Sequence, residues 1–356
     1  MDTLKYMLLP FLCSALLTPL VQYLAVKLEV YAEMNERTVH TKKIARIGGV
    51  SIYVAFLLCM AYFMKTDITI NGILIGGSIM FFGGLVDDMV NLPPKVKLLI
   101  EVLAAIVLMV VGKVSLDIIR LPFGITIDMG LISFLVTFVW IIGITNAVNL
   151  IDGLDGLSGG ICTIILIVIA CLSTIEGRMD IQVMSLILAG STLGFLLFNW
   201  HPASIFMGDC GALFLGFIIS AISLLGFKSS TIMTLALPIL LLMVPIVDTL
   251  GAIVRRKLSG HKFSDADKKH VHHLLMQRFG HRNTVLILYV VTALFGFTAF
   301  VYIVNKVAGL IALFIMAIIV ELFLEISGMI AGNYHPLLSI YRRLTRKKKN
   351  QEKNGD

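Results

Sequence analysis

The sequence predicts an all-α integral membrane protein with about eleven transmembrane helices. Hydrophobic residues make up 58% of the 356 residues and charged residues only 14%, whereas soluble globular domains carry about 25% charged residues. Apolar runs close to the length that crosses a bilayer as a helix recur along the whole chain. The sequence lacks the short alternating segments of a membrane β-barrel, so helices are the expected spanning elements.

The apolar runs set the expected helices to within a few residues. They cover residues 4–26, 47–64, 70–86, 97–112, 131–148, 158–175, 181–198, 210–226, 231–252, 284–304 and 308–327. We expect one transmembrane domain over residues 1–332 and a basic cytoplasmic tail over residues 333–356. Alternating residues around a Pro-Phe-Gly turn predict a small hairpin in the loop 113–130.

The distribution of positive charge predicts the orientation. One alternate set of gaps between the runs, together with the tail and with Lys97 at the edge of one gap, holds 22 of the 29 Lys and Arg residues. Because cytoplasmic loops carry the excess of Lys and Arg, this set is cytoplasmic, the N-terminus lies outside and the C-terminus inside. The net charge of +7 is then a topology signal. Basic patches interleaved with aromatic residues are missing, so no nucleic-acid partner is expected.

Carboxylates gather at the predicted cytoplasmic ends of the spans. They are Asp87, Asp88, Asp152, Asp155, Asp209 and Asp248. Ionisable groups at membrane depth are costly and usually functional. Carboxylates that lie close together repel one another and need a cation, and oxygen ligands favour Mg²⁺ or Mn²⁺ over zinc. The sequence therefore predicts an active site with a hard metal ion on the cytoplasmic face.

The segment NAVNLIDGLDGL, residues 146–157, places a polar residue at every third position. These residues are Asn146, Asn149, Asp152 and Asp155. Residues three apart are neighbours on a helix, so the four form two adjacent pairs along one winding edge. Such an edge can hold a polar ligand or a metal ion. The alternative is a set of hydrogen bonds that join helices within the bundle.

Two cytoplasmic loops combine cations with histidines. The first contains His40 and Arg46, and the largest contains His270, His272 and His273 beside lysines. Cations next to carboxylates and a metal ion suit a substrate with several negative charges, such as a pyrophosphate or a nucleotide. Topological charge alone explains the number of cations but not the histidines. The sequence has no HExxH pattern, so a zinc site is not expected.

Taken together, these motifs resemble those of the polyprenyl-phosphate N-acetylhexosamine-1-phosphate transferases. The matching segments are GGLVDDMVNLPPKVKLL (83–99), NAVNLIDGLDGL (146–157), FMGDCGALFLG (206–216), ADKKHVHHLL (266–275) and the opening RTVHTKKIARIGG (37–49). The opening segment reads KIAR where the family usually has PIPR. The third residue of the family's DDxxD motif is Asn91 here, so the resemblance does not extend a metal-binding role to it.

The resemblance implies a bacterial plasma-membrane enzyme that moves a phospho-sugar from a UDP-sugar to a polyprenyl phosphate and releases UMP. Its catalytic residues would be Asp87, Asp88 and Asp209. Asp209, with Asp152, would bind Mg²⁺ or Mn²⁺, while Asp87 and Asp88 would receive the lipid phosphate. The resemblance is compatible with a homodimer.

The remaining substrate contacts follow from the same motifs. Asn146, Asn149, Asp152 and Asp155 would line the nucleotide-sugar pocket, and Phe206 would pack on uracil or make an ordinary apolar contact. The pyrophosphate would be held by Arg46, Lys97, His40, His270, His272 and His273.

Two alternatives to a UDP-GlcNAc enzyme remain at this stage. The branch that uses UDP-MurNAc-pentapeptide typically carries three consecutive histidines, whereas this chain has His270-Val271-His272-His273, which favours UDP-GlcNAc. A membrane transporter would place charged groups near the bilayer midplane. The midplanes of these spans are almost free of charge, which favours an enzyme.

Overall fold

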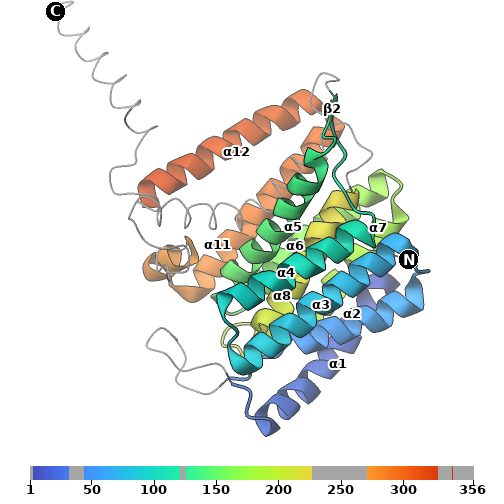
Figure 1. The fold of residues 1–356 in the computed structure, drawn as a ribbon. Helices are drawn as coiled ribbons and strands as arrows, with labels where there is room; N and C mark the ends of the chain where they lie inside the picture. Colours follow the sequence, from blue (N-terminus) through green and yellow to red (C-terminus); the bar gives the residue numbers. More distant parts are fainter. Residues whose placement is uncertain (1–2, 32–43, 121–125, 227–270, 328–338, 340–356) are drawn as a thin grey trace, which may run out of the picture.

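The structure, a computed structural model, describes residues 3–31, 44–120, 126–226, 271–327 and 339. The described chain is helical apart from one two-stranded antiparallel sheet (Figure 1). Seven of the described helices are long and apolar enough to cross a membrane. The chain is therefore a multi-pass helical membrane protein, as the composition predicted.

The helices coincide with the apolar runs to within a few residues wherever the chain is described. They are α1 (Lys5–Lys27), α2 (Gly49–Phe63), α3 (Ile68–Val90), α4 (Pro94–Val110), α5 (Ile132–Ile151), α6 (Leu157–Ile175), α7 (Met179–Asn199), α8 (Gly208–Gly226), α11 (Val271–Val304) and α12 (Lys306–Ser327). The predicted span 231–252 lies outside the described residues. In α11 the backbone breaks at Gly280, where φ is 74°, so the predicted start at residue 284 falls just after the break.

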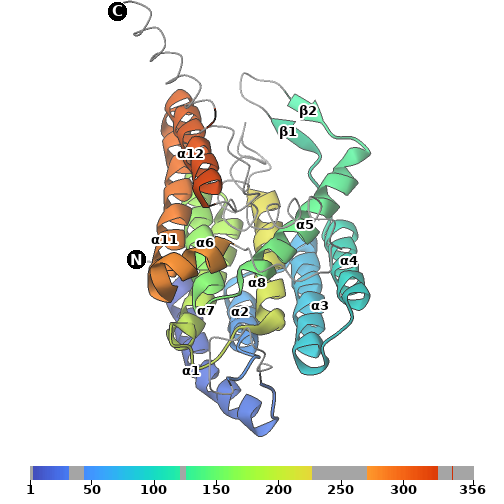
Figure 2. The ribbon, with the colours of Figure 1, turned by 90° about the vertical axis from the view of Figure 1, so that its left-hand side faces the viewer.

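The predicted hairpin is confirmed. Strands β1 (Ile118–Arg120) and β2 (Thr126–Asp128) pair antiparallel, with Ile119 opposite Ile127. Figures 1 and 2 show the hairpin at one end of the bundle and the turn between α3 and α4 at the other. The motif residues of α3 and α4 described below therefore lie at the end opposite the hairpin.

Helix α8 runs through the middle of the bundle, and 89% of its apolar stretch is buried (Figure 2). Small residues let neighbouring helices approach it closely. A Cβ atom on Gly49 of α2 would lie 2.3 Å from Gly211 Cα. A Cβ atom on Gly84 of α3 would lie 2.6 Å from Cys210 Cα. Helix association in membranes depends on such close van der Waals packing, because the hydrophobic effect does not drive helices together within lipid.

We predict that Gly84→Ala destabilises the protein, because the added Cβ meets the Asp209 carbonyl and Cys210 Cα at 2.6 Å, and backbone cannot move aside cheaply. Overpacking of this kind costs about 1–3 kcal/mol. Gly143→Ala in α5 is the matched control, since its Cβ meets nothing within 4 Å. Thermal unfolding in detergent should show a lower midpoint for Gly84→Ala only. Equal midpoints for the two variants would contradict this packing.

Candidate functional site

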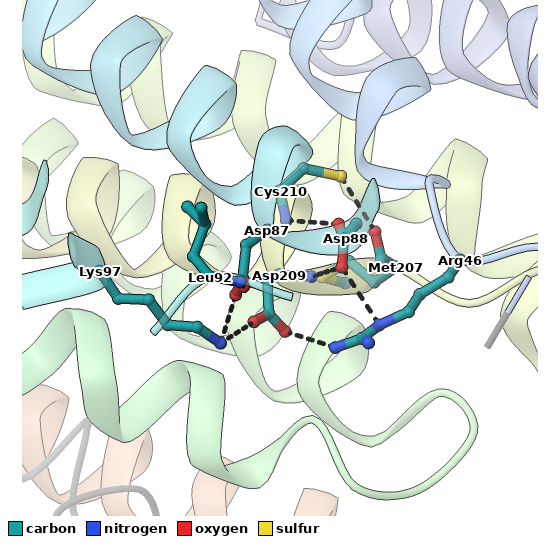
Figure 3. A network of polar contacts seen from close by, with 8 residues as sticks. All are labelled: Arg46, Asp87, Asp88, Leu92, Lys97, Met207, Asp209 and Cys210. Atoms are coloured by element: carbon teal, nitrogen blue, oxygen red, sulfur yellow. Dashed lines mark hydrogen bonds and ion pairs between the residues drawn. The ribbon is translucent and has the colours of Figure 1, made fainter. Parts of the chain in front are cut away.

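Five charged side chains form a row of ion pairs at the end of α3, in which carboxylates alternate with cations (Figure 3). In order along the row they are Asp88, Arg46, Asp209, Lys97 and Asp87. Arg46 Nε lies 3.1 Å from Asp88 Oδ1, and its Nη2 lies 3.0 Å from Asp209 Oδ1. Lys97 Nζ lies 3.4 Å from Asp209 Oδ2 and also pairs with Asp87. Asp209 is thus held between two cations from different segments.

Backbone hydrogen bonds place Arg46 beside Asp209. The amide of Phe206 donates to the Ala45 carbonyl at 2.8 Å, and the amide of Gly48 donates to the Phe206 carbonyl at 2.9 Å. The segment before α2 is therefore paired with the segment before α8. Burial alone would lower the pKa of the Arg46 guanidinium, but Asp209 and Asp88 outweigh this effect and raise it. Arg46 stays charged.

Asp88 caps the N-terminus of α8. Its two oxygens accept hydrogen bonds from the backbone amides of Asp209 (2.8 Å) and Cys210 (2.9 Å). The first amides of a helix have no partner within the helix and carry its positive dipole end, so a carboxylate there is stabilising. The Asp88 side chain is 0% exposed. Asp88 therefore holds the start of α8 in the structure, and the substrate contact implied by the motif stays a prediction.

Asp87 and Lys97 are brought together by the turn between α3 and α4. Asn91 ends α3 in the left-handed conformation, with φ of 52°, which asparagine tolerates better than most residues. Asp87 Oδ1 then accepts from the Leu92 amide at 2.8 Å. The presence of Asn91 in place of the family's third aspartate is thus compatible with a helix-capping role.

Asp152 lies just beyond α5 and is half-buried. Burial raises its pKa to about 7, and the negative charges of Asp209, Asp88 and Asp155 add to this effect while Arg46 opposes it. A bound cation would favour the ionised form of Asp152.

Asn146 is held by a carboxylate that the sequence analysis missed. Its amide donates to Glu101 Oε2 at 2.6 Å and to the Ile142 carbonyl at 3.0 Å. Glu101 belongs to α4 and is only 6% exposed. A single carboxylate inside the apolar run 97–112 was the signal that could have identified it. Asn149, one turn further along α5, is half-buried.

Asp155 belongs to a second cluster, with two histidines that the sequence analysis also missed. Its Oδ2 lies 2.7 Å from His201 Nδ1 and accepts from the Ala203 amide at 3.1 Å. Its own amide donates to His281 Nε2 at 3.1 Å. Asp155 therefore joins the turn after α5 to the segment after α7 and to α11.

The other predicted contacts are placed only in part. Phe206 is half-buried in the segment before α8. His40 and His270 lie outside the described residues, as do the side chains of His272 and His273 in the first turn of α11. Their roles stay predictions.

An apolar groove of about 650 Å³ runs between α3 and α4 towards this site. Its lining includes Ile79, Phe82 and Val86 of α3, Leu92 of the turn, and Val96 and Ile100 of α4. Val86 directly precedes Asp87 and Val96 directly precedes Lys97, so the groove reaches the turn that carries this pair, although neither charged side chain lines it. An apolar groove that reaches a turn carrying a cation suits a lipid with an anionic head group.

The donor atoms around Asp209 suit a hard divalent cation. Asp87, Asp152 and Asp209 offer only oxygen, which Mg²⁺ prefers. Within the described residues, these carboxylates do not gather three ligand atoms within 4.8 Å. A Mg²⁺ site beside phosphates usually takes one or two carboxylates together with water and substrate oxygens, and the metal stays a prediction.

Comparison with known proteins shows which family this chain belongs to. Residues 70–227 match the model of glycosyl transferase family 4. A probable undecaprenyl-phosphate N-acetylglucosaminyl 1-phosphate transferase from Bacillus subtilis (strain 168) is 38% identical over 341 residues, covering 93% of this chain and 94% of that protein. The chain belongs to glycosyl transferase family 4. The family resemblance inferred from the motifs is thereby confirmed.

Two further relatives are named for different sugar substrates. A decaprenyl-phosphate N-acetylglucosaminephosphotransferase from Mycobacterium leprae (strain TN) is 32% identical, with 79% of each chain covered. A phospho-N-acetylmuramoyl-pentapeptide-transferase from Streptococcus pneumoniae serotype 19F (strain G54) is 30% identical, covering 50% of this chain and 58% of that protein. The match to the N-acetylglucosaminephosphotransferase thus covers more of this chain than the match to the pentapeptide transferase.

Proposed function

We propose that the protein transfers N-acetylglucosamine 1-phosphate from UDP-GlcNAc to undecaprenyl phosphate, releasing UMP. The observation that carries the proposal is Asp209 held between Arg46 and Lys97, with an apolar groove that reaches Val96, the residue before Lys97. The near full-length similarity to the Bacillus subtilis transferase supports the donor and the lipid.

In this reaction an oxygen of the lipid phosphate attacks the β-phosphorus of UDP-GlcNAc. A new P–O bond forms there, and the bond from that phosphorus to the bridging oxygen breaks, so UMP leaves with both bonding electrons. Charge neutralisation and alignment dominate such transfers. Arg46 and Lys97 would place positive charge on either side of the reacting phosphates.

Asp209 and Asp152 would hold Mg²⁺, with Mn²⁺ as a substitute. When bound, the ion supplies further charge neutralisation for the pyrophosphate. Lys97 lies within reach of both Asp87 and Asp209, so an incoming phosphate would compete with these carboxylates for its ammonium group. The lipid phosphate would thus take its place at Lys97, beside the end of the groove.

Asp87 would orient the lipid phosphate through Lys97 rather than remove a proton. A phosphate monoester has a second pKa near ~6 and is already largely dianionic at neutral pH. A strong base is therefore not required. The Asn146 amide nitrogen bonds to Glu101, so its side-chain oxygen would face the nucleotide-sugar. Asn149 would line the same side of the site.

The groove between α3 and α4 would take the first isoprene units of the lipid. The site lies at the end of the bundle opposite the hairpin, and the positive-charge pattern supports a cytoplasmic position for that end. The eleven-span arrangement, the outer N-terminus and the bacterial plasma membrane belong to the same proposal. UDP-MurNAc-pentapeptide is the second candidate donor, since the Streptococcus pneumoniae relative is named for that substrate group.

We predict UMP release from UDP-GlcNAc in detergent with Mg²⁺ and undecaprenyl phosphate. Lys97→Gln should lower kcat/KM about 10²–10³-fold, as expected for loss of a group that stabilises charge in the transition state. Lys95→Gln is the matched control, because Lys95 is exposed two residues earlier on α4 and should change the rate little.

Three outcomes of this assay would contradict the proposal. UMP from UDP-MurNAc-pentapeptide alone would overturn the donor, and UDP in place of UMP would overturn phospho-sugar transfer. Equal effects of Lys97→Gln and Lys95→Gln would remove Lys97 from the site.

We also predict that Ile100→Trp raises KM for undecaprenyl phosphate, because the indole would fill the groove that Ile100 lines. KM for a short-chain prenyl phosphate should rise less, since fewer isoprene units need the groove. Leu103→Trp is the control on the same helix, at a position that is 51% exposed. Kinetics with both acceptors measure this difference. The same change in KM for both variants would exclude the groove as the lipid path.

A further inference from the structure

Glu101 of α4 is a buried carboxylate inside the apolar run 97–112. It lies about 10 Å along the helix axis from Pro94, the first residue of α4, and it is 6% exposed. An ionisable group at this depth is costly and usually has a functional reason. Its hydrogen bond with Asn146 joins α4 to α5, so helix packing and the reaction are the two explanations to separate.

The hydrogen bonds of Asn146 determine which atom of its amide is left over. Its Nδ2 donates to Glu101 Oε2 at 2.6 Å and to the Ile142 carbonyl at 3.0 Å. Neither an ionised carboxylate nor a carbonyl has a hydrogen to give, so the flipped amide would place oxygen against oxygen. Both N–H groups are thus used, and Oδ1 has no hydrogen-bond partner among the described residues.

The chemistry of a carboxylate explains why glutamate suits this position better than glutamine. A glutamine amide both donates and accepts, so it would satisfy either orientation of the Asn146 amide. An ionised carboxylate only accepts, so it enforces the orientation that leaves Oδ1 available. Lys97 lies four residues earlier on the same face of α4, where an opposite charge is favourable.

The same face of α4 also holds the row of ion pairs around Asp209. Lys97 Nζ lies 3.4 Å from Asp209 Oδ2, and Glu101 follows about 6 Å further along the helix axis. One helix therefore fixes both the Asp209 carboxylate and the Asn146 amide. Side chains held by packed helices position a ligand more precisely than side chains on loops.

We propose that Glu101 is a positioning residue for the nucleotide-sugar. It holds Asn146 so that Oδ1 accepts a hydrogen bond from an N–H or O–H group of the UDP-sugar, and it does not touch the substrate itself. This inference rests on the proposed transfer from a UDP-sugar. Loss of Glu101 would weaken UDP-sugar binding through Asn146, whereas a residue that only joins two helices would affect stability alone.

Equilibrium binding of radiolabelled UDP-GlcNAc tests this role apart from turnover. The full-length protein is used in detergent with Mg²⁺ and without polyprenyl phosphate, so no transfer occurs. We expect Glu101→Leu to raise Kd about 10-fold, the usual effect of one lost hydrogen bond. Glu101→Gln keeps an acceptor oxygen and should raise Kd about threefold, because a neutral hydrogen bond is roughly half as strong as a charge-assisted one.

Glu321→Leu is the matched control for Glu101→Leu. It makes the same change at a half-buried glutamate of α12, to which we assign no role, and it should leave Kd unchanged. Thermal unfolding and gel filtration check that each variant is folded. If Glu101→Leu does not fold, Glu101→Gln takes its place in every comparison.

A double-mutant cycle with Asn146→Ala separates positioning from helix packing. If Glu101 acts through Asn146, the double variant should bind no more weakly than Asn146→Ala, with Kd raised about 10-fold. Independent effects of Glu101→Leu and Asn146→Ala would multiply to about 100-fold. That multiplied value would overturn the role of Glu101, as would a lowered unfolding midpoint with unchanged Kd in Glu101→Leu, or an equal rise of Kd in Glu321→Leu.

Failure of this inference is distinguishable from failure of the proposed function. UMP release together with independent effects in the cycle would overturn the role of Glu101 and keep the transfer. Coupled binding without UMP release in the complete assay would overturn the transfer and keep the role of Glu101. A wild type that binds neither UDP-GlcNAc nor UDP-MurNAc-pentapeptide would overturn both.

Discussion

The carboxylate of Asp88 at the start of α8 is the interaction on which the rest of the site depends. It satisfies the amides of Asp209 and Cys210 and pairs with Arg46. One buried side chain thus fixes the end of the central helix and the position of a cation, Arg46, beside the Asp209 carboxylate. A buried carboxylate without such partners would be costly.

The balance of charge around Asp209 explains how the site can exist without substrate and still accept it. Within the described part of the chain, three carboxylates are close to two cations, Arg46 and Lys97. The excess negative charge favours a further cation, while the two basic groups favour phosphates. Substrate and metal would therefore enter by exchanging partners within an existing set of ion pairs, so neither charge needs to be buried alone.

Hydrophobicity predicted the helices because each spanning segment must satisfy its own backbone hydrogen bonds. The motifs also identified the residues that converge, such as Asp87, Lys97 and Asp209. They could not separate Asp87 from Asp88. These neighbours differ by about 100° around α3, so one faces Lys97 and the other faces α8. Glu101, His201 and His281 were missed because each is an isolated residue whose partners are distant in the sequence.

The central claim is that Asp88 positions Asp209. The most direct test compares the stability and the turnover of Asp88→Asn with those of Asp87→Asn. If Asp88 positions Asp209, Asp88→Asn loses stability by about 1–3 kcal/mol, because an amide NH₂ would face a backbone N–H, and turnover falls with it. Asp87→Asn keeps the oxygen for Leu92 and relieves repulsion with Asp209, so it should lose turnover while remaining close to wild-type stability. An Asp88→Asn protein as stable as the wild type but inactive would contradict the claim and make Asp88 a group that acts on substrate.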